Sequence, residues 1–163
     1  MVEVYVLVEK KKSVFLTIFS VFSYVMGGIS FLALFLGMDL LLIPAILGFL
    51  LGWFLQTRNY EYEYSYFDGD VRFAKIINKA NRKKLPGYKM SEVLAIAPSG
   101  DASVAQYEND SKAKIRRLQS GYPDRKLYVM AAKGQNGPEL VYFEPDDKYL
   151  DAVCIKYGYK VRR

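Results

Sequence analysis

The side chains that most often carry catalysis or bind transition metals are nearly absent from this sequence. Its 163 residues include no histidine and a single cysteine, Cys154. This composition excludes Ser–His and Cys–His dyads, imidazole acid–base catalysis and histidine-containing zinc sites. A lone thiol cannot close an intramolecular disulfide, so nothing indicates an oxidising compartment. Cys154 recurs at helical spacing with Leu150, Val153 and Tyr157, which favours a packing role for it.

Two pairs of carboxylates remain as candidates for proton transfer or cation binding. Asp68 and Asp70 flank a glycine in a hairpin-turn signal, and Asp146 and Asp147 follow a proline where a helical pattern begins. Turn formation and helix initiation account for both pairs, with divalent-cation binding as the alternative. We therefore expect no catalytic residue, no metal site and no cofactor, and a protein that is not an enzyme.

The composition of the chain, and with it the kind of structure that can position a binding surface, changes near residue 57. Asp39 is the only charged side chain between residues 13 and 57, whereas residues 58–163 have the composition of an ordinary polar domain. Residues 14–36 form an apolar run that spans about 34 Å as a helix, enough to cross a bilayer core. After a turn, residues 40–55 form a second run of about 24 Å, which needs its flanking residues or local thinning to cross.

These runs predict a multi-pass protein of the cell membrane, with a transmembrane helical hairpin over residues 14–56. A cytoplasmic segment, residues 1–13, precedes the hairpin, and a cytoplasmic domain, residues 57–163, follows it. Three lysines at positions 10–12 precede the hairpin and Arg58 follows it, while the turn carries only an acid. Positive flanks stay inside, so both termini are expected to be cytoplasmic. A buried helix of a soluble protein and a cleaved signal peptide fit less well.

Glycines predict where the two spans pack, because helices in a bilayer associate through close backbone approach. Counted from the turn, two glycines of the first span lie at the same depth as the first glycine of the second span. The expected packing positions are Gly27, Gly28, Gly48 and Gly52. A homodimer face at these glycines is the alternative, so the oligomeric state stays open.

Residues 60–163 read as a β-rich domain that ends in a helix. Tyr60, Tyr62, Tyr64 and Tyr66 alternate with polar residues, which favours a half-buried sheet face over a platform for carbohydrate or nucleobases. The residues before the first span alternate in the same way and predict either a strand or an interfacial helix. Further strands are expected at about residues 71–77, 82–85, 93–97, 113–119, 126–132 and 139–143, with a short helix at 102–107.

Four stretches carry a resemblance: YEYEYSYFDGDVRFAKII from Tyr60, NKANRKKL from Asn78, VLAIAP from Val93 and VYFEPDDKYL from Val141. They resemble an uncharacterised family of small bacterial two-pass membrane proteins with a C-terminal pleckstrin-homology-like domain. The resemblance implies an α+β fold. In that fold a two-helix transmembrane hairpin precedes a pleckstrin-homology-like β-barrel or sandwich of about seven strands, capped by a C-terminal helix. The acidic turn at residues 68–70 departs from lipid-binding domains of this kind, which argues against phosphoinositide recognition.

The net charge of +6 arises in one segment, because residues 71–91 hold seven cations and no acid. The expected lipid- or partner-binding basic patch comprises Arg72, Lys75, Lys79, Arg82, Lys83, Lys84 and Lys89. We expect a non-enzymatic membrane-anchored adaptor or scaffold that binds a protein or peptide partner. The alternative is a regulatory membrane protein that engages anionic lipid headgroups through residues 72–89. Because the membrane accounts for the charge, no nucleic-acid partner is expected.

Overall fold

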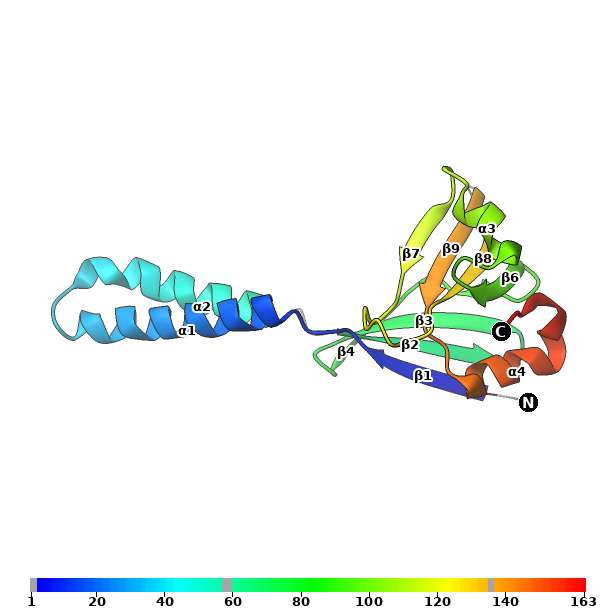
Figure 1. The fold of residues 1–163 in the computed structure, drawn as a ribbon. Helices are drawn as coiled ribbons and strands as arrows, with labels where there is room; N and C mark the ends of the chain where they lie inside the picture. Colours follow the sequence, from blue (N-terminus) through cyan, green and yellow to red (C-terminus); the bar gives the residue numbers. More distant parts are fainter. Residues whose placement is uncertain (1–2, 57–59, 135–136) are drawn as a thin grey trace. The chain divides into compact units, whose positions relative to one another are not determined.

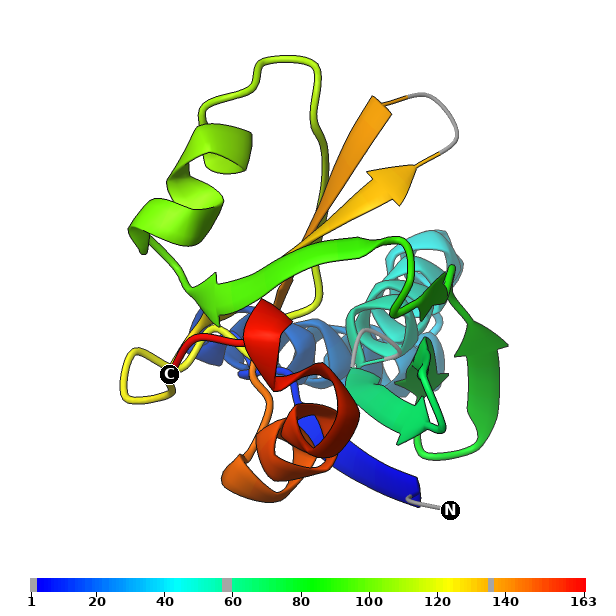
Figure 2. The ribbon, with the colours of Figure 1, turned by 90° about the vertical axis from the view of Figure 1, so that its right-hand side faces the viewer.

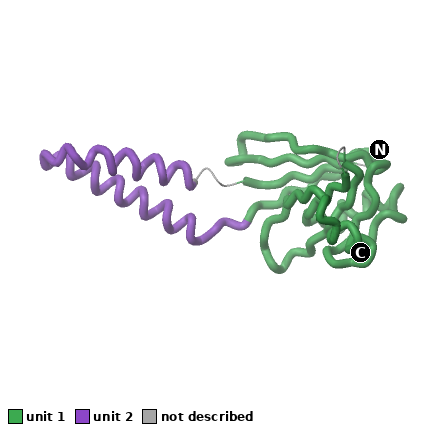
Figure 3. Tube along the Cα trace, turned by 90° about the horizontal axis from the view of Figure 1, so that it is seen from above, with its two compact units in different colours: residues 1–10, 60–163 green, residues 11–59 purple. Residues whose placement is uncertain are grey.

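The computed structural model of the chain forms two compact units, which Figure 3 colours separately. The larger unit contains Met1–Lys10 and Tyr60–Arg163, and the smaller unit contains Lys11–Asn59. The residues that the structure describes are 3–56, 60–134 and 137–163. The larger unit is therefore built from two pieces of chain, and the whole smaller unit is inserted between them.

This division differs from the predicted boundaries, which set residues 1–13 apart from the β-rich domain. Strand β1 (Glu3–Glu9) pairs antiparallel with β2 (Tyr60–Phe67) along its full length. Val8 of β1 is fully buried in the core of the larger unit. The N-terminal residues are thus a strand of the domain rather than an interfacial helix. Arg58, the cation expected after the second span, lies outside the described residues.

The smaller unit is a pair of apolar helices. α1 (Val14–Leu34) begins after Ser13, whose side chain accepts a hydrogen bond from the Leu16 N–H. The 3-10 turn η1 (Asp39–Leu41) leads into α2 (Leu42–Gln56). Among the described helices, α1 alone is long and apolar enough to cross a membrane by itself, and the second apolar stretch is shorter. The two expected helices are present, and their passage through a bilayer remains a prediction.

Small residues line the contact between α1 and α2. Ser20, Ser23 and Gly27 are buried on one face of α1. The Ser20 hydroxyl donates a hydrogen bond of 3.1 Å to the carbonyl of Gly52 on the other helix. A Cβ atom added at Gly48 would lie 2.8 Å from the Cα of Gly27. The backbones of the two helices therefore approach as closely as glycine allows.

The predicted packing position Gly28 is an exception. A Cβ added there meets no atom within 4 Å, so Gly28 is not a contact between the helices. Gly27 takes that role instead, since a Cβ on it would lie 3.2 Å from the Ala45 carbonyl. At Gly52 an added Cβ would lie 2.9 Å from the Tyr24 ring. The contact face of α1 thus includes one of the two neighbouring glycines, because adjacent helical residues point about 100° apart.

The first sheet of the larger unit runs in the order β1–β2–β3–β4, the strands labelled in Figure 1. β5 also pairs with β3. The further strands of this sheet are β3 (Asp70–Ile77), β4 (Asn81–Lys84) and β5 (Tyr88–Lys89). Asp68 and Gly69 join β2 to β3 with φ angles of 43° and 99°. Such left-handed conformations are what a tight hairpin turn requires. The helical hairpin connects β1 to β2, so this acidic turn is the second connection of the sheet rather than the first.

The second sheet runs in the order β6–β8–β9–β7. Its strands are β6 (Val93–Pro98), β7 (Lys114–Arg117), β8 (Tyr128–Gly134) and β9 (Gly137–Phe143), and α3 (Ala102–Glu108) connects β6 to β7. All pairs are antiparallel except β7 with β9, which are parallel. β7 is the edge strand of this sheet, and the connection that contains α3 leads to it from β6.

The core lies between the two sheets and is closed by α4 (Asp147–Tyr157), which lies beside β1 in Figure 2. Asp146 caps this helix through a 2.8 Å hydrogen bond from the Tyr149 N–H. Edge-on contacts join the ring of Phe143 to those of Tyr64 and Tyr149 at centroid distances of 5.6 and 6.0 Å. The tyrosines of β2 are thus a buried sheet face, as predicted. Cys154 is half-buried at the margin of this core.

The predicted α+β fold of two N-terminal helices, packed sheets and a C-terminal helix is confirmed. The described residues contain nine strands rather than about seven. One additional strand is β1, which the sequence left open. The other is β5, a two-residue pairing too short to give a periodic pattern.

Candidate functional site

The cations expected to form one basic patch are divided among local contacts. Arg72 of β3 lies 2.9 Å from a carboxylate oxygen of Asp70 on the same strand. Arg82 of β4 pairs with Glu63 on the outer face of the first sheet. Lys75 lies over the ring of Tyr60, 3.6 Å from its centroid. Arg72 and Arg82 are thus each offset by an acid, whereas the contact with the Tyr60 ring leaves the charge of Lys75 in place.

Lys83, Lys84 and Lys89 make no ion pair within the described part of the chain, and all three are exposed. Lys83 and Lys84 are neighbours on β4, so their side chains point to opposite faces of the sheet. Lys89 lies on the separate strand β5. The structure therefore does not bring the seven predicted residues together as one surface.

Three of the four paired carboxylates have structural partners, and the fourth, Asp147, lies in the first turn of α4. Asp68 pairs with Lys156 of α4, and this hydrogen bond, with the charge of the ammonium group, lowers the pKa of Asp68. Asp70 pairs with Arg72, and Asp146 caps α4. Within residues 3–56, 60–134 and 137–163, no three potential metal ligands among Asp, Glu, Cys and His cluster.

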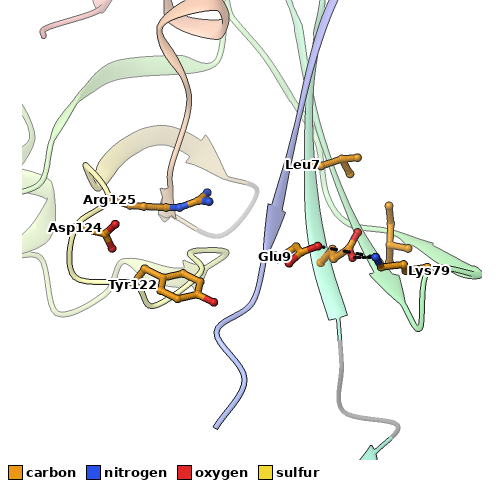
Figure 4. A pocket seen from close by; sticks show the side chains of 8 residues that line it. Leu7, Glu9, Lys79, Tyr122, Asp124 and Arg125 are labelled. Carbon is orange, nitrogen blue, oxygen red and sulfur yellow. Dashed lines mark ion pairs between the residues drawn. The ribbon is translucent and has the colours of Figure 1, made fainter. Parts of the chain in front are cut away.

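A hollow of about 740 Å³ borders β1 (Figure 4). Lys79 lies on one side of this strand, and Tyr122 and Arg125 lie on the other. The Lys79 ammonium is 4.0 Å from Glu9 and 3.9 Å from Glu61, so the two acids outweigh the cation. Lys79, a predicted site residue, therefore connects β1, β2 and the turn after β3. With two cations against three acids in its lining, the hollow has no excess positive charge.

A second hollow, of about 480 Å³, lies between β5 of the first sheet and β7, β8 and β9 of the second. We name it the cationic cleft. Its charged lining residues are Lys112, Lys114, Arg116, Lys133, Glu92 and Glu139. Pro86 and Gly87 before β5, and Gly134, Gly137 and Pro138 of the β8 and β9 strands, also line it. Four cations against two acids distinguish this cleft from the hollow at β1.

A hydrogen-bonded trio forms the floor of the cationic cleft. Glu139 accepts a 2.6 Å hydrogen bond from the Tyr88 hydroxyl and a 3.0 Å hydrogen bond from Nε of Arg116. Burial acts to raise the pKa of Glu139, but the bonds from Tyr88 and Arg116 and the charges of Arg116 and Lys114 outweigh it, so its pKa is lowered. Burial, with the bond to Glu139, raises the pKa of Tyr88. Glu139 is therefore ionised and Tyr88 protonated at neutral pH.

The lysines at the rim of the cleft are not neutralised in this way. Lys112, Lys114 and Lys133 are exposed and make no ion pair with any described residue. Arg116 is already paired with Glu139, and Glu92 is the remaining acid of the lining. The arrangement thus has a neutralised floor and a positive rim, which suits binding of an anionic group.

The chain of two sheets, a closing helix and an inserted helical hairpin matches a known protein family. The family described as "Bacterial PH-like domain (DUF6106)" matches residues 2–163. The chain belongs to this family. The match covers β1, the inserted hairpin and the rest of the domain. The DUF6106 family model therefore includes the helical hairpin between β1 and β2. Neither a curated protein nor a solved structure matches the chain.

Within this DUF6106 chain, sequence reasoning missed the cationic cleft. A signal was present, because Lys114 and Arg116 at a spacing of two share one face of a strand, and Lys112 lies in the turn just before it. The cluster of seven cations in residues 71–91 was stronger and drew the prediction instead. Their acidic partners, such as Glu63 and Glu9, lie far away in the sequence and become neighbours only through sheet pairing.

Proposed function

We propose that this protein is a non-enzymatic adaptor of the cell membrane that holds a segment of a partner protein in the cationic cleft. In this proposal α1 and the η1–α2 stretch cross the bilayer, and both termini are cytoplasmic. The observation that carries the proposal is the rim of Lys112, Lys114 and Lys133, whose ammonium groups make no ion pair among the described residues. Uncompensated charge around a formed cleft is complementary to an acidic ligand.

The surface of the helical pair supports the membrane anchor. Large apolar side chains cover the outside of both helices, among them Phe15, Leu32 and Trp53, each more than 60% exposed. Such a surface is costly in water and suited to lipid. α1 spans about 32 Å, and η1 with α2 spans roughly 28 Å. Both lengths match a hydrocarbon core of about 30 Å, with slight tilt or thinning.

The chain connections support a domain kept at the membrane surface. The chain leaves the first sheet after Glu9 and returns to it at Tyr60, on the neighbouring strand. Linkers of a few residues join the sheet to α1 and α2, and each residue extends the chain by at most about 3.5 Å. The lysines at positions 10–12 and Arg58 flank the spans, which favours a cytoplasmic domain.

The electrostatics of the cleft favour binding over catalysis. A group that transfers protons at neutral pH needs a pKa near 7. In the cleft the pKa of Glu139 is lowered and that of Tyr88 is raised, so both move away from neutrality. Together with Arg116 they fix the floor of the cleft, and the lysines above them supply charge without a nucleophile.

The lipid alternative rests on the remaining exposed cations of residues 72–89. Lys83, Lys84 and Lys89 are exposed and make no ion pair with any described residue, although the Lys89 N–H donates a hydrogen bond to the Glu92 carboxylate. Each cation near an anionic leaflet contributes about 1 kcal/mol. The other four members of the segment are engaged by Asp70, Tyr60, Glu63 and the acids around Lys79. This division favours the adaptor over specific lipid recognition.

Photo-crosslinking in intact cells tests the adaptor. A photoreactive phenylalanine analogue at Lys114 is expected to crosslink to a protein, whereas the same group at Lys84 of the exposed strand β4 serves as the matched control. Mass spectrometry should identify a protein adduct that forms from position 114 and not from position 84. Adducts of lipid alone at both positions would overturn the adaptor and leave the lipid alternative.

A further inference from the structure

The two edge strands of the second sheet differ in their backbone pairing. At the β6 edge the C-terminal residues add a short bridge, with Ile96 paired to Val161 and the Arg162 N–H donating a 2.8 Å hydrogen bond to the Ile96 carbonyl. The β7 edge pairs only with β9, and within the described residues no backbone pairing covers its other side. An unpaired edge strand is a template for a further strand.

The register identifies which backbone groups point outward. The Leu118 N–H donates a 2.8 Å hydrogen bond to the Tyr142 carbonyl of β9. Alternate residues of a strand direct their N–H and C=O groups to opposite sides. Lys114 and Arg116 therefore direct their backbone groups to β9, as Leu118 does. Ile115 and Arg117 direct theirs to the open edge, which leaves two N–H donors and two C=O acceptors for an added strand.

The side chains beside this edge define the chemistry of the added strand. On the cleft side lie Lys112, Lys114 and Arg116, together with Lys133 across the cleft. On the opposite face lie Ile115, whose side chain is 49% exposed, and the exposed Arg117 at the end of the strand. A strand added here presents alternate side chains to these two faces. Acidic residues meet the lysines and aliphatic residues meet Ile115.

We propose that an extended peptide segment with alternating acidic and aliphatic residues adds as a strand to the open edge of β7. Its carboxylates lie in the cationic cleft. Main-chain hydrogen bonds to Ile115 and Arg117 supply affinity, and the lysines supply selectivity for acids. This inference rests on the proposed adaptor function and names its partner chemistry and binding mode.

The test uses the full-length protein in nanodiscs of neutral phosphatidylcholine. The probe is a fluorescent eight-residue peptide of alternating Glu and Val, and its binding is followed by fluorescence anisotropy. A peptide with Gln in place of Glu tests the charge, and a peptide N-methylated at alternate residues tests the backbone hydrogen bonds. Both control peptides are expected to bind about tenfold more weakly, the equivalent of about one hydrogen bond or charge pair.

Two variants of the protein separate strand addition from simple charge attraction. Ile115→Pro removes one outward N–H, leaves the bonds to β9 in place and is a substitution that edge strands tolerate. It should weaken the Glu/Val peptide about tenfold, whereas Ile115→Val, which keeps the N–H and an aliphatic side chain, should weaken binding far less. Lys112→Gln with Lys114→Gln should weaken binding by a similar factor. The matched pair Lys83→Gln with Lys84→Gln, on β4, should not. Unchanged β-sheet circular dichroism is the folding control for each variant.

Each result decides the inference. Equal losses from the cleft pair and the β4 pair, or unchanged binding with Ile115→Pro and with the N-methylated peptide, would overturn strand addition. Binding that appears only in nanodiscs with anionic phosphatidylglycerol would also overturn it and favour lipid. A protein that crosslinks to a partner in cells but binds none of these peptides would refute this inference and leave the adaptor proposal standing.

Discussion

Removal of β1 is expected to prevent the PH-like domain from folding. Val8 is fully buried, and Val4 and Val6 pack against the same core. Burial of an aliphatic side chain contributes about 1.5–3 kcal/mol, so loss of the three removes a large share of the roughly 5–15 kcal/mol that stabilises a domain. A chain of residues 60–163 would also expose the edge of β2. It should lack a cooperative thermal transition and should aggregate.

A matched chain should fold without the helical hairpin. Lys10 and Tyr60 face one another at the end of the β1–β2 pair, and the Lys10 N–H donates a 3.2 Å hydrogen bond to the Tyr60 carbonyl. Such a hydrogen-bonded pair is closed well by a two-residue turn. Replacing Lys11–Asn59 by Asn-Gly should therefore give a soluble domain with a cooperative transition. If the chain without β1 melts as cooperatively as this one, β1 is not part of the domain.

Gly48→Leu is expected to separate the two apolar helices. An added Cβ would lie 2.8 Å from the Cα of Gly27 and 2.9 Å from the carbonyl oxygen of Ser23, and neither backbone atom can rotate away. The helices must therefore move apart, with an expected cost of about 3 kcal/mol, at the upper end of typical overpacking. Unfolding by SDS titration in mixed micelles, followed by the fluorescence of the only tryptophan, Trp53, measures the loss.

Gly28→Leu is the matched control for this prediction. An added Cβ at Gly28 meets nothing within 4 Å, so the larger side chain extends away from α2. Its midpoint of unfolding should stay within the error of the parent protein. Equal shifts for Gly28→Leu and Gly48→Leu would show that the helices pack through other faces.

Much of the fold was readable from local pattern. The alternation from Tyr60 to Tyr66, the Asp-Gly turn after it and the capped C-terminal helix each specify structure within a few residues. The assignment of β1 to the domain was not readable in this way, because its partner β2 lies on the far side of the hairpin. A short alternating segment before an apolar run is compatible with a strand or an interfacial helix until that partner is known.

The candidate site was even less predictable from local sequence pattern than β1. Sequence counting identifies where cations are dense, but it does not identify which of them are neutralised. Arg82 and Lys79 lose their excess charge to acids on other strands, whereas Lys112 and Lys114 keep theirs. Gly27 and Gly28 illustrate the point for packing, since rotation about the helix places only one of them in the contact. Long-range pairing decides such cases, and a single sequence does not encode it locally.

Labelling of single cysteines in intact cells tests the two-pass anchor, on which the whole proposal depends. In a Cys154→Ala background, cysteine is placed either at Met38, between the helices, or at Ser99, in the exposed turn after β6. A membrane-impermeant maleimide should label the cysteine at Met38 and should label the one at Ser99 only after the cells are opened. Labelling of the cysteine at Ser99 in intact cells would contradict a cytoplasmic adaptor held by a two-pass hairpin.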